Sequence, residues 1–113
     1  MSVSPERIAH DIETIAGFSE VASSIGYSRP TFTPQWVAAR DYVMHQAMDV
    51  GCKTRFDAAG NVHIRSQRFG WEEPLWLSGS HIDSVPTGGK YDGVVGIVAP
   101  LEVLRVARMR RWN

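Results

Sequence analysis

Apolar positions near the start of the chain repeat at the spacing of an amphipathic helix. Ser4-Pro5-Glu6 combines a capping residue, a proline suited to the first helical position and an acidic residue suited to the first turn. The apolar residues that follow at helical spacing are Ile8, Ile12 and Ile15. The pattern therefore predicts a helix that ends near Gly17.

A second helix is predicted after a long connection. Residues 18–32 contain a glycine, a proline and many small polar residues without a sustained period, which is typical of a long loop. Ordered loops of this length often carry function. Thr33-Pro34 repeats the pairing of a cap residue with proline, and Gly51 is a natural stop. One helical stripe joins Trp36, Ala39, Val43, Ala47 and Val50.

The middle of the chain changes to patterns that are typical of strands. Residues 53–56 and 62–65 flank Asp57-Ala58-Ala59-Gly60-Asn61, whose residue types favour a turn, so we expect a hairpin. The short apolar run Leu75-Trp76-Leu77 ends in Ser78-Gly79-Ser80, as a buried central strand would.

The last predicted helix contains a proline. Its apolar positions are Val94, Ile97, Val98, Leu101, Leu104 and Val106, and they lead toward Arg108. Pro100 lies inside this pattern and should kink the helix or mark its true start, because proline lacks an N–H donor. Helix, helix, hairpin, strand and helix together form the opening of a layered α/β domain, with about three strands and three helices.

Composition narrows the class of protein. A chain of 113 residues fits one small domain, and 43% hydrophobic residues allow a core. Twelve basic and twelve acidic residues balance, which argues against a disordered tail and a nucleic-acid footprint. Charged residues interrupt the first twenty positions, so we expect no signal peptide, and no later apolar stretch is long enough for us to expect a membrane span. Cys52 is the single cysteine, which suits a reducing cytoplasm.

His81 is a candidate metal ligand because it follows the predicted central strand. Ligands bind beyond the carboxyl ends of strands in open α/β sheets. A neutral imidazole binds a metal through one nitrogen when the other nitrogen is held in the right tautomer, and Asp83 is placed to accept that second N–H. His81 and Asp83 therefore form a possible ligand with its orienting residue.

Asp92 is a candidate for a bridging carboxylate. Gly88 and Gly89 permit unusual backbone angles, so the loop should fold back and bring Asp92 toward His81. One carboxylate can bind two divalent ions that lie roughly 3.5 to 4 Å apart. We therefore assign Asp92 a bridging role as a hypothesis.

The run from Gly79 to Gly93, continuing through Gly96 and residues 101–104, resembles the metal-binding signature of the amidase, hydantoinase/carbamoylase family of M20-type metallopeptidases. Upstream segments resemble the opening of this family in the same order: Tyr27-Ser28-Arg29, Thr33-Pro34-Gln35-Trp36, Ala39-Arg40, Gly51 and residues 57–62. The resemblance implies that residues 1–113 are a partial N-terminal segment of a zinc-exopeptidase-like three-layer α/β/α catalytic domain, without the family's lid or dimerisation domain.

The resemblance also implies roles for the candidate residues. His81 would bind one metal, Asp92 would bridge two, and Asp83 would support His81. Two divalent ions, zinc or manganese, serve the family, whose members are expected to form homodimers. The family's adjacent glutamates, which supply a general base and a ligand, and its further histidines have no counterpart here; Glu72-Glu73 precedes the ligand segment in a loop. We therefore expect weak metal binding or none in this chain.

The function implied by the resemblance is hydrolysis of carbon–nitrogen bonds in N-carbamoyl-L-amino acids or ureido compounds such as allantoate, by a fragment that is inactive alone. Arg29 lies in the long loop, and its guanidinium group could pair with a substrate carboxylate. The alternatives are a fragment of an M20-type peptidase or deacylase, and a non-catalytic binding module. Residues 108–113 depart from the family pattern, which a truncation or an altered reading frame would explain.

Other reactive residue types have simpler interpretations. Cys52 is interpreted as a small apolar filler. Structural roles are also preferred for the remaining histidines and for three tryptophans that should pack in the core or at its edge: His10, His45, His63, Trp36, Trp71 and Trp76. An exposed helix end explains the basic residues Arg105, Arg108, Arg110 and Arg111.

Overall fold

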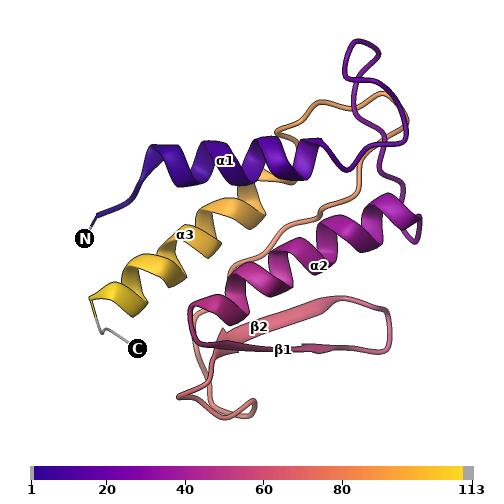
Figure 1. Cartoon of the computed structure of the whole chain (residues 1–113). Helices are drawn as coiled ribbons and strands as arrows, with labels where there is room; N and C mark the ends of the chain where they lie inside the picture. The colour runs from indigo at the N-terminus through magenta and orange to yellow at the C-terminus, as the bar shows by residue number, and fades with distance from the viewer. Residues whose placement is uncertain (1, 111–113) are drawn as a thin grey trace.

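The computed structural model describes residues 2–110, which form three helices and one hairpin. The elements are α1 (Pro5–Ala16), α2 (Pro34–Asp49), β1 (Cys52–Phe56), β2 (Val62–Ser66) and α3 (Val95–Met109). Figure 1 shows α1 and α3 side by side, with the hairpin against the opposite face of α2. The predicted α/β class is confirmed, and α2 is the central layer between the other helices and the hairpin.

Both predicted helix starts are confirmed by their caps. The Ser4 hydroxyl accepts a hydrogen bond from the Arg7 N–H at 3.2 Å, and the Thr33 hydroxyl accepts one from the Trp36 N–H at 3.3 Å. Each proline follows its cap at the first helical position. Gly51 has a φ of 83°, so the chain leaves α2 through a left-handed conformation that suits glycine and enters β1 directly.

The predicted hairpin is also confirmed. β1 and β2 pair antiparallel, with Cys52 opposite Ser66 at one end and Phe56 opposite Val62 at the other. The Asp57 carboxylate accepts the N–H groups of Ala59 and Asn61, each at 3.0 Å, which closes the loop between the strands.

The core lies where the three helices meet and continues beneath the hairpin. Its first cluster contains Ile12, Ile15, Ala39, Val43, Val94 and Val98. The second contains Ala47, Cys52 and Leu101. Cys52 is buried, and burial raises the pKa of its thiol, so it lies in the core as the small apolar filler that was expected.

Pro100 does not mark the beginning of the last helix. α3 starts at Val95, so Pro100 lies within it. The helix loses one hydrogen bond there, but it buries Val98, Leu101 and Val106 against the other elements. Tertiary packing therefore outweighs the local cost of the proline. None of the helices within residues 2–110 is long and apolar enough to cross a membrane.

The predicted central strand at Leu75-Trp76-Leu77 is wrong for this structure. Among the described residues, β1 and β2 are the only strands of the sheet, so this segment has no neighbour to pair with. Leu75 and Leu77 are 45% and 89% exposed, and Trp76 is fully exposed. The expected packing of Trp76 is therefore also wrong. A strand needs a partner for its backbone groups as well as an apolar pattern.

The exposed apolar segment predicts self-association. Replacing Trp76 and Leu77 together with glutamine should increase the monomeric fraction, because contiguous exposed apolar surface drives association. Sedimentation velocity over a concentration series measures the change. Val103→Gln is the control, because Val103 is 59% exposed on α3 outside this segment. A parent chain that stays monodisperse would instead favour the alternative that the chain is a non-catalytic binding module.

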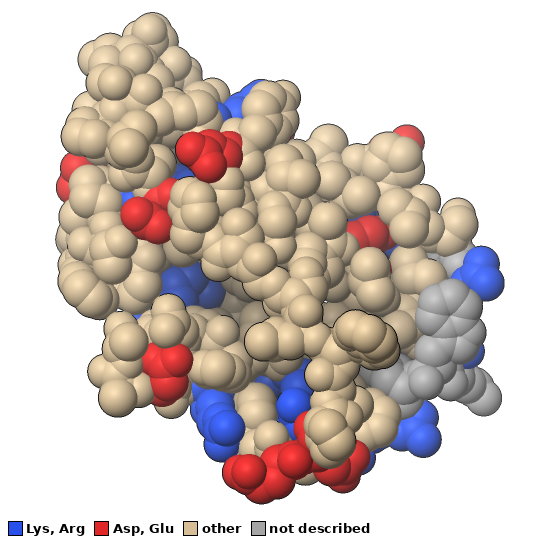
Figure 2. Space-filling view, turned by 180° about the vertical axis from the view of Figure 1, so that it is seen from behind, with Lys and Arg blue, Asp and Glu red and all other residues tan. Residues whose placement is uncertain are grey.

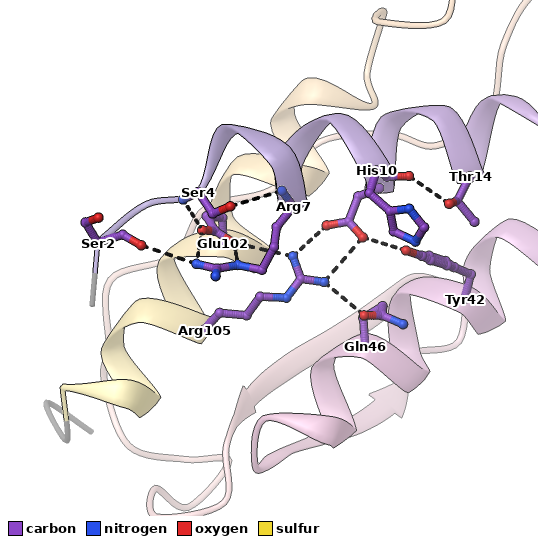
Figure 3. Close-up of polar contacts among 10 residues, drawn as sticks. Ser2, Ser4, Arg7, His10, Thr14, Tyr42, Gln46, Glu102 and Arg105 are labelled. Atoms are coloured by element: carbon purple, nitrogen blue, oxygen red, sulfur yellow. Dashed lines mark hydrogen bonds and ion pairs between the residues drawn. The ribbon is translucent and has the colours of Figure 1, made fainter.

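A buried ionic network joins α1 to α3 (Figure 3). The Arg105 guanidinium donates to the Asp11 carboxylate at 2.6 Å, and the Tyr42 hydroxyl donates to the same carboxylate at 2.5 Å. Glu102 receives two N–H groups of Arg7, at 2.6 and 3.0 Å. Arg105 is only 8% exposed, so its assignment to an exposed helix end is wrong. Arg111 to Asn113 lie outside the described residues.

We expect Asp11→Ala to lower the free energy of unfolding by about 3 to 5 kcal/mol, because it leaves the buried Arg105 cation without its main partner. Asp41→Ala breaks the partly exposed Arg40–Asp41 pair and should cost at most about 1 kcal/mol. Urea unfolding followed by circular dichroism compares the two variants. Equal losses would show that the network contributes no more than a surface pair.

Charged side chains of both signs lie on the face of the molecule that is turned away from the viewer in Figure 1. Figure 2 shows basic and acidic side chains interspersed over this face, with groups of both signs next to each other at its lower edge. This distribution fits the balanced composition of the chain.

Candidate metal centre

The His81 ring is held on one side by the chain that follows it. Its Nδ1 atom lies 3.0 Å from the backbone oxygen of Asp83 and 3.3 Å from the Oδ1 atom of the same residue. Both of these atoms accept hydrogen bonds, so a neutral ring with its proton on Nδ1 can donate it to Asp83. Asp83 therefore has the geometry of the predicted orienting residue, and it uses its carbonyl as well as its carboxylate.

The other ring nitrogen of His81 faces Asp92. The distance from Nε2 to the Asp92 Oδ1 atom is 3.4 Å, so the two predicted ligand residues converge. Both side chains are more than half exposed. When Nδ1 carries the proton, the Nε2 lone pair and the carboxylate are two acceptors directed at the same small region. A shared cation is one way to satisfy both acceptors.

Gly93, and not the Gly88-Gly89 pair, provides the backbone freedom that brings Asp92 to His81. Gly93 has a φ of 74°, whereas neither Gly88 nor Gly89 has a positive φ. A Cβ atom at position 93 would lie 2.5 Å from Cε1 and 2.6 Å from Nδ1 of His81. Only glycine therefore allows the chain to pass this close to the ring. The sequence analysis assigned this freedom to Gly88 and Gly89. The glycine directly after Asp92 is the feature that could have indicated the contact.

The beginning of α3 is also pressed against the segment that carries His81. A Cβ atom at Gly96 would lie 2.6 Å from the Cβ atom of Ser80. Val94 is fully buried in the first core cluster, which fixes the start of α3 against α1 and α2. Two glycines and one valine thus position Asp92 relative to His81.

The separation of the candidate ligands fits a shared divalent ion. Two ligand atoms about 2.1 Å from a tetrahedral zinc ion lie roughly 3.4 Å apart, and the Nε2–Oδ1 distance in this structure is 3.4 Å. Imidazole and carboxylate are both usual zinc ligands. Across residues 2–110, however, no three histidine, cysteine or acidic side chains are grouped closely enough to hold an ion. His81 and Asp92 therefore supply part of a coordination sphere.

Arg29 does not face an open site. Its side chain is buried, and its Nε atom donates to the Ile82 carbonyl at 2.7 Å, while Nη1 donates to the carbonyls of Ile15 and Phe18, each at 3.0 Å. Burial lowers the pKa of Arg29, and the Asp83 carboxylate acts in the opposite direction. This geometry does not favour the predicted pairing with a substrate carboxylate, which stays a prediction.

The long connection before α2 is hydrogen-bonded to the loop that joins His81 to Asp92. Tyr27 and Gly88 exchange two backbone hydrogen bonds of 3.0 and 2.9 Å, and the Ser84 N–H donates to the Arg29 carbonyl at 3.0 Å. Lys90 forms an ion pair with Glu13 of α1. The loop between His81 and Asp92 is therefore attached to both the connection and α1. Ser84 and Lys90 carried no sequence signal that indicated these contacts.

The residues that were given structural interpretations lie away from His81. His63 contacts Asp57 in the hairpin at 3.0 Å, and His10 and His45 are exposed on α1 and α2. Trp36 packs against Phe32 with ring centroids 5.3 Å apart, and the Arg55 guanidinium lies 4.3 Å from the Trp71 ring. Trp36 and Trp71 therefore pack at the edge of the structure, as was expected of them.

Known proteins resemble this chain over nearly all of its length. It is 39% identical over 101 residues to the N-carbamoyl-L-amino-acid amidohydrolase of Paenarthrobacter aurescens, covering 89% of this chain and 24% of that protein. It is 34% identical over 108 residues to the ureidoglycolate hydrolase of Arabidopsis thaliana, covering 96% of this chain and 22% of that protein. No model of a protein family matches the chain.

Solved structures of hydantoinase/carbamoylase family amidases also resemble this chain in fold. A solved hydantoinase/carbamoylase family amidase from Burkholderia multivorans superimposes with a TM-score of 0.86 at 32% identity, covering 96% of this chain and 26% of that one. The described fold is thus that of part of a hydantoinase/carbamoylase family amidase. The chain belongs to the hydantoinase/carbamoylase family of amidases and spans about a quarter of the length of the relatives it matches.

The close approach of Gly93 to His81 can be tested by adding one methyl group. Gly93→Ala should lower the free energy of unfolding by about 1 to 3 kcal/mol, because it forces a left-handed conformation on alanine and collides with the ring. Gly89→Ala is the control, since a Cβ atom there meets nothing within 4 Å. Thermal and urea unfolding measure both changes. An equal effect of the two substitutions would contradict the described packing.

Proposed function

We propose that this chain supplies two ligand residues, His81 and Asp92, to the divalent metal site of an amidohydrolase that cleaves carbon–nitrogen bonds in N-carbamoyl-L-amino acids or ureido compounds such as allantoate. The observation that carries the proposal is the approach of Nε2 to Oδ1 at 3.4 Å, with Nδ1 held by Asp83 on the opposite side of the ring.

Each residue has one task in this proposal. Asp83 keeps the Nδ1 proton in place, so that the Nε2 lone pair is free to bind a cation. Asp92 provides one oxygen beside Nε2 and has a second oxygen available for another ion. A pair of bound divalent ions, zinc or manganese, would polarise the substrate carbonyl and acidify water in the site. Gly93 keeps the His81 ring and the Asp92 carboxylate at the required separation.

The substrate class is supported by the names of the relatives, which refer to ureidoglycolate and to N-carbamoyl-L-amino acids. Both names describe compounds with a carbonyl between nitrogen atoms, which a Lewis acid can polarise. No contact among the described residues favours a peptidase or deacylase over this class. The carbamoyl and ureido assignment is therefore preferred.

We further propose that the chain is inactive by itself. A general base is needed to remove a proton from water, and Glu72-Glu73, its single adjacent acidic pair, lies in an exposed loop after the hairpin. Glu73 accepts the N–H of Gly70 at 3.1 Å within that loop. This pair is therefore not placed to serve the His81–Asp92 site.

Calorimetric titration with zinc or manganese tests the ligand assignment separately from catalysis. The parent chain should bind weakly, because it supplies fewer than the four ligands of a closed zinc site, and His81→Ala and Asp92→Ala should each weaken binding by about 10-fold or more. His63→Ala is the matched control, because His63 also contacts an aspartate but lies in the hairpin. Equal binding by the parent and both ligand variants would refute the assignment.

An activity assay on the parent chain and the His81→Ala variant tests the proposed inactivity. With metal present, the parent chain should release no ammonia from an N-carbamoyl amino acid or allantoate, whereas a full-length relative should do so. Measured turnover that disappears in His81→Ala would refute the proposed inactivity and support the site. A full-length relative that prefers dipeptides over carbamoyl amino acids would instead favour the peptidase alternative.

A further inference from the structure

Arg29 joins two parts of the chain that are distant in sequence. It is 2% exposed, which is rare for a cation, and its partners are backbone carbonyls and not a facing carboxylate within ion-pair distance. Ile15 lies in the last turn of α1, where helix carbonyls lack partners within the helix, and Phe18 follows two residues after the helix ends. The guanidinium group therefore stabilises the negative end of the α1 dipole from outside the helix.

The third carbonyl held by Arg29 belongs to Ile82, which lies between His81 and Asp83. Nε donates to it at 2.7 Å, the shortest of the three bonds. The backbone of Arg29 also holds Ser84, two residues after Ile82: its N–H donates to the Ser84 hydroxyl at 2.9 Å, and its carbonyl accepts the Ser84 N–H at 3.0 Å. Residues 82–84 are therefore fixed by Arg29 through three hydrogen bonds.

We propose that Arg29 is a positioning residue that holds the segment around His81 and Asp83 against the end of α1. The Asp83 carbonyl, which accepts from the His81 ring, lies between two backbone positions that Arg29 holds. Loss of the guanidinium would release Ile82 and let the Asp83 carbonyl move away from Nδ1. The metal-binding consequence of this inference rests on the proposed function, whereas the effect on the ring does not.

The planar guanidinium group explains why this position needs arginine. Its donors point in fixed directions, so Nε reaches the Ile82 carbonyl while Nη1 reaches the carbonyls of Ile15 and Phe18. A lysine ammonium is a compact charge at the end of a flexible chain and cannot reproduce that arrangement. Arg29→Lys should therefore preserve the charge but hold Ile82 poorly.

Two measurements on the full chain test the proposal. The first is the dissociation constant for zinc from calorimetry, which should rise about 10-fold or more in Arg29→Met and less in Arg29→Lys, as is usual when support for a ligand is lost. The second is the pair of ¹⁵N shifts of the neutral His81 ring. The parent should show the proton on Nδ1, and Arg29→Met should shift toward a mixture of tautomers.

Arg105→Met is the matched control. Arg105 is also a buried arginine that stabilises α1, through Asp11, but it has no hydrogen bond to residues 80–84. We expect this variant to lower the melting temperature while changing the zinc affinity less than about 3-fold and leaving the His81 shifts unchanged. Similar changes in both variants would show that Arg29 acts only through general stability, which would overturn the proposal.

Ser84→Ala provides a second test if Arg29→Met does not fold. It removes the hydroxyl that accepts the Arg29 N–H and donates to the Tyr27 carbonyl at 3.0 Å, while the buried guanidinium group stays in place. A smaller shift of the His81 ring nitrogens in the same direction supports the proposal, and unchanged nitrogens overturn it. If the parent binds no zinc, the proposed metal site fails, and the nitrogen shifts still decide the role of Arg29.

Discussion

The structure around His81 depends on a backbone contact that excludes even a single methyl group. Gly93 passes so close to the His81 ring that a Cβ atom would overlap it, and Gly96 approaches Ser80 in the same way. Steric exclusion is steep over tenths of an ångström, whereas attraction between exposed side chains is weak and is screened by water. The distance between His81 and Asp92 is therefore set by packing of the chain, and their charges matter only within that frame.

Two buried arginines stabilise different parts of α1, its middle and its carboxyl end, and have different consequences. Arg105 satisfies Asp11 and joins α1 to α3, so that both helices form one support (Figure 3). Arg29 satisfies the carbonyls at the carboxyl end of α1 and reaches Ile82 beside the candidate ligands. Burying a cation is costly unless its donors find acceptors, and each arginine meets that requirement with groups from separate segments. Arg105 therefore couples the position of α3 to α1, and Arg29 couples the position of Ile82 to the end of α1.

His81, Asp83 and Asp92 have a defined arrangement in this chain. Asp83 orients the His81 ring, and Asp92 lies across from it. The chain spans about a quarter of the length of its relatives, so we propose that this arrangement is part of a larger site. Leu75-Trp76-Leu77 has the apolar pattern of a buried strand, but its backbone finds no strand partner among residues 2–110.

The sequence by itself determined α1, α2, the hairpin and the placement of Asp83 beside His81, because caps, turn residues and short-range periodicity act over a few positions. Only the tertiary structure decided three further points. Gly93 carries the positive φ in place of Gly88 or Gly89, Arg29 turns away from an open site, and Arg105 is buried. Each of these depends on which distant segment supplies the neighbouring atoms, and local pattern contains no record of such neighbours.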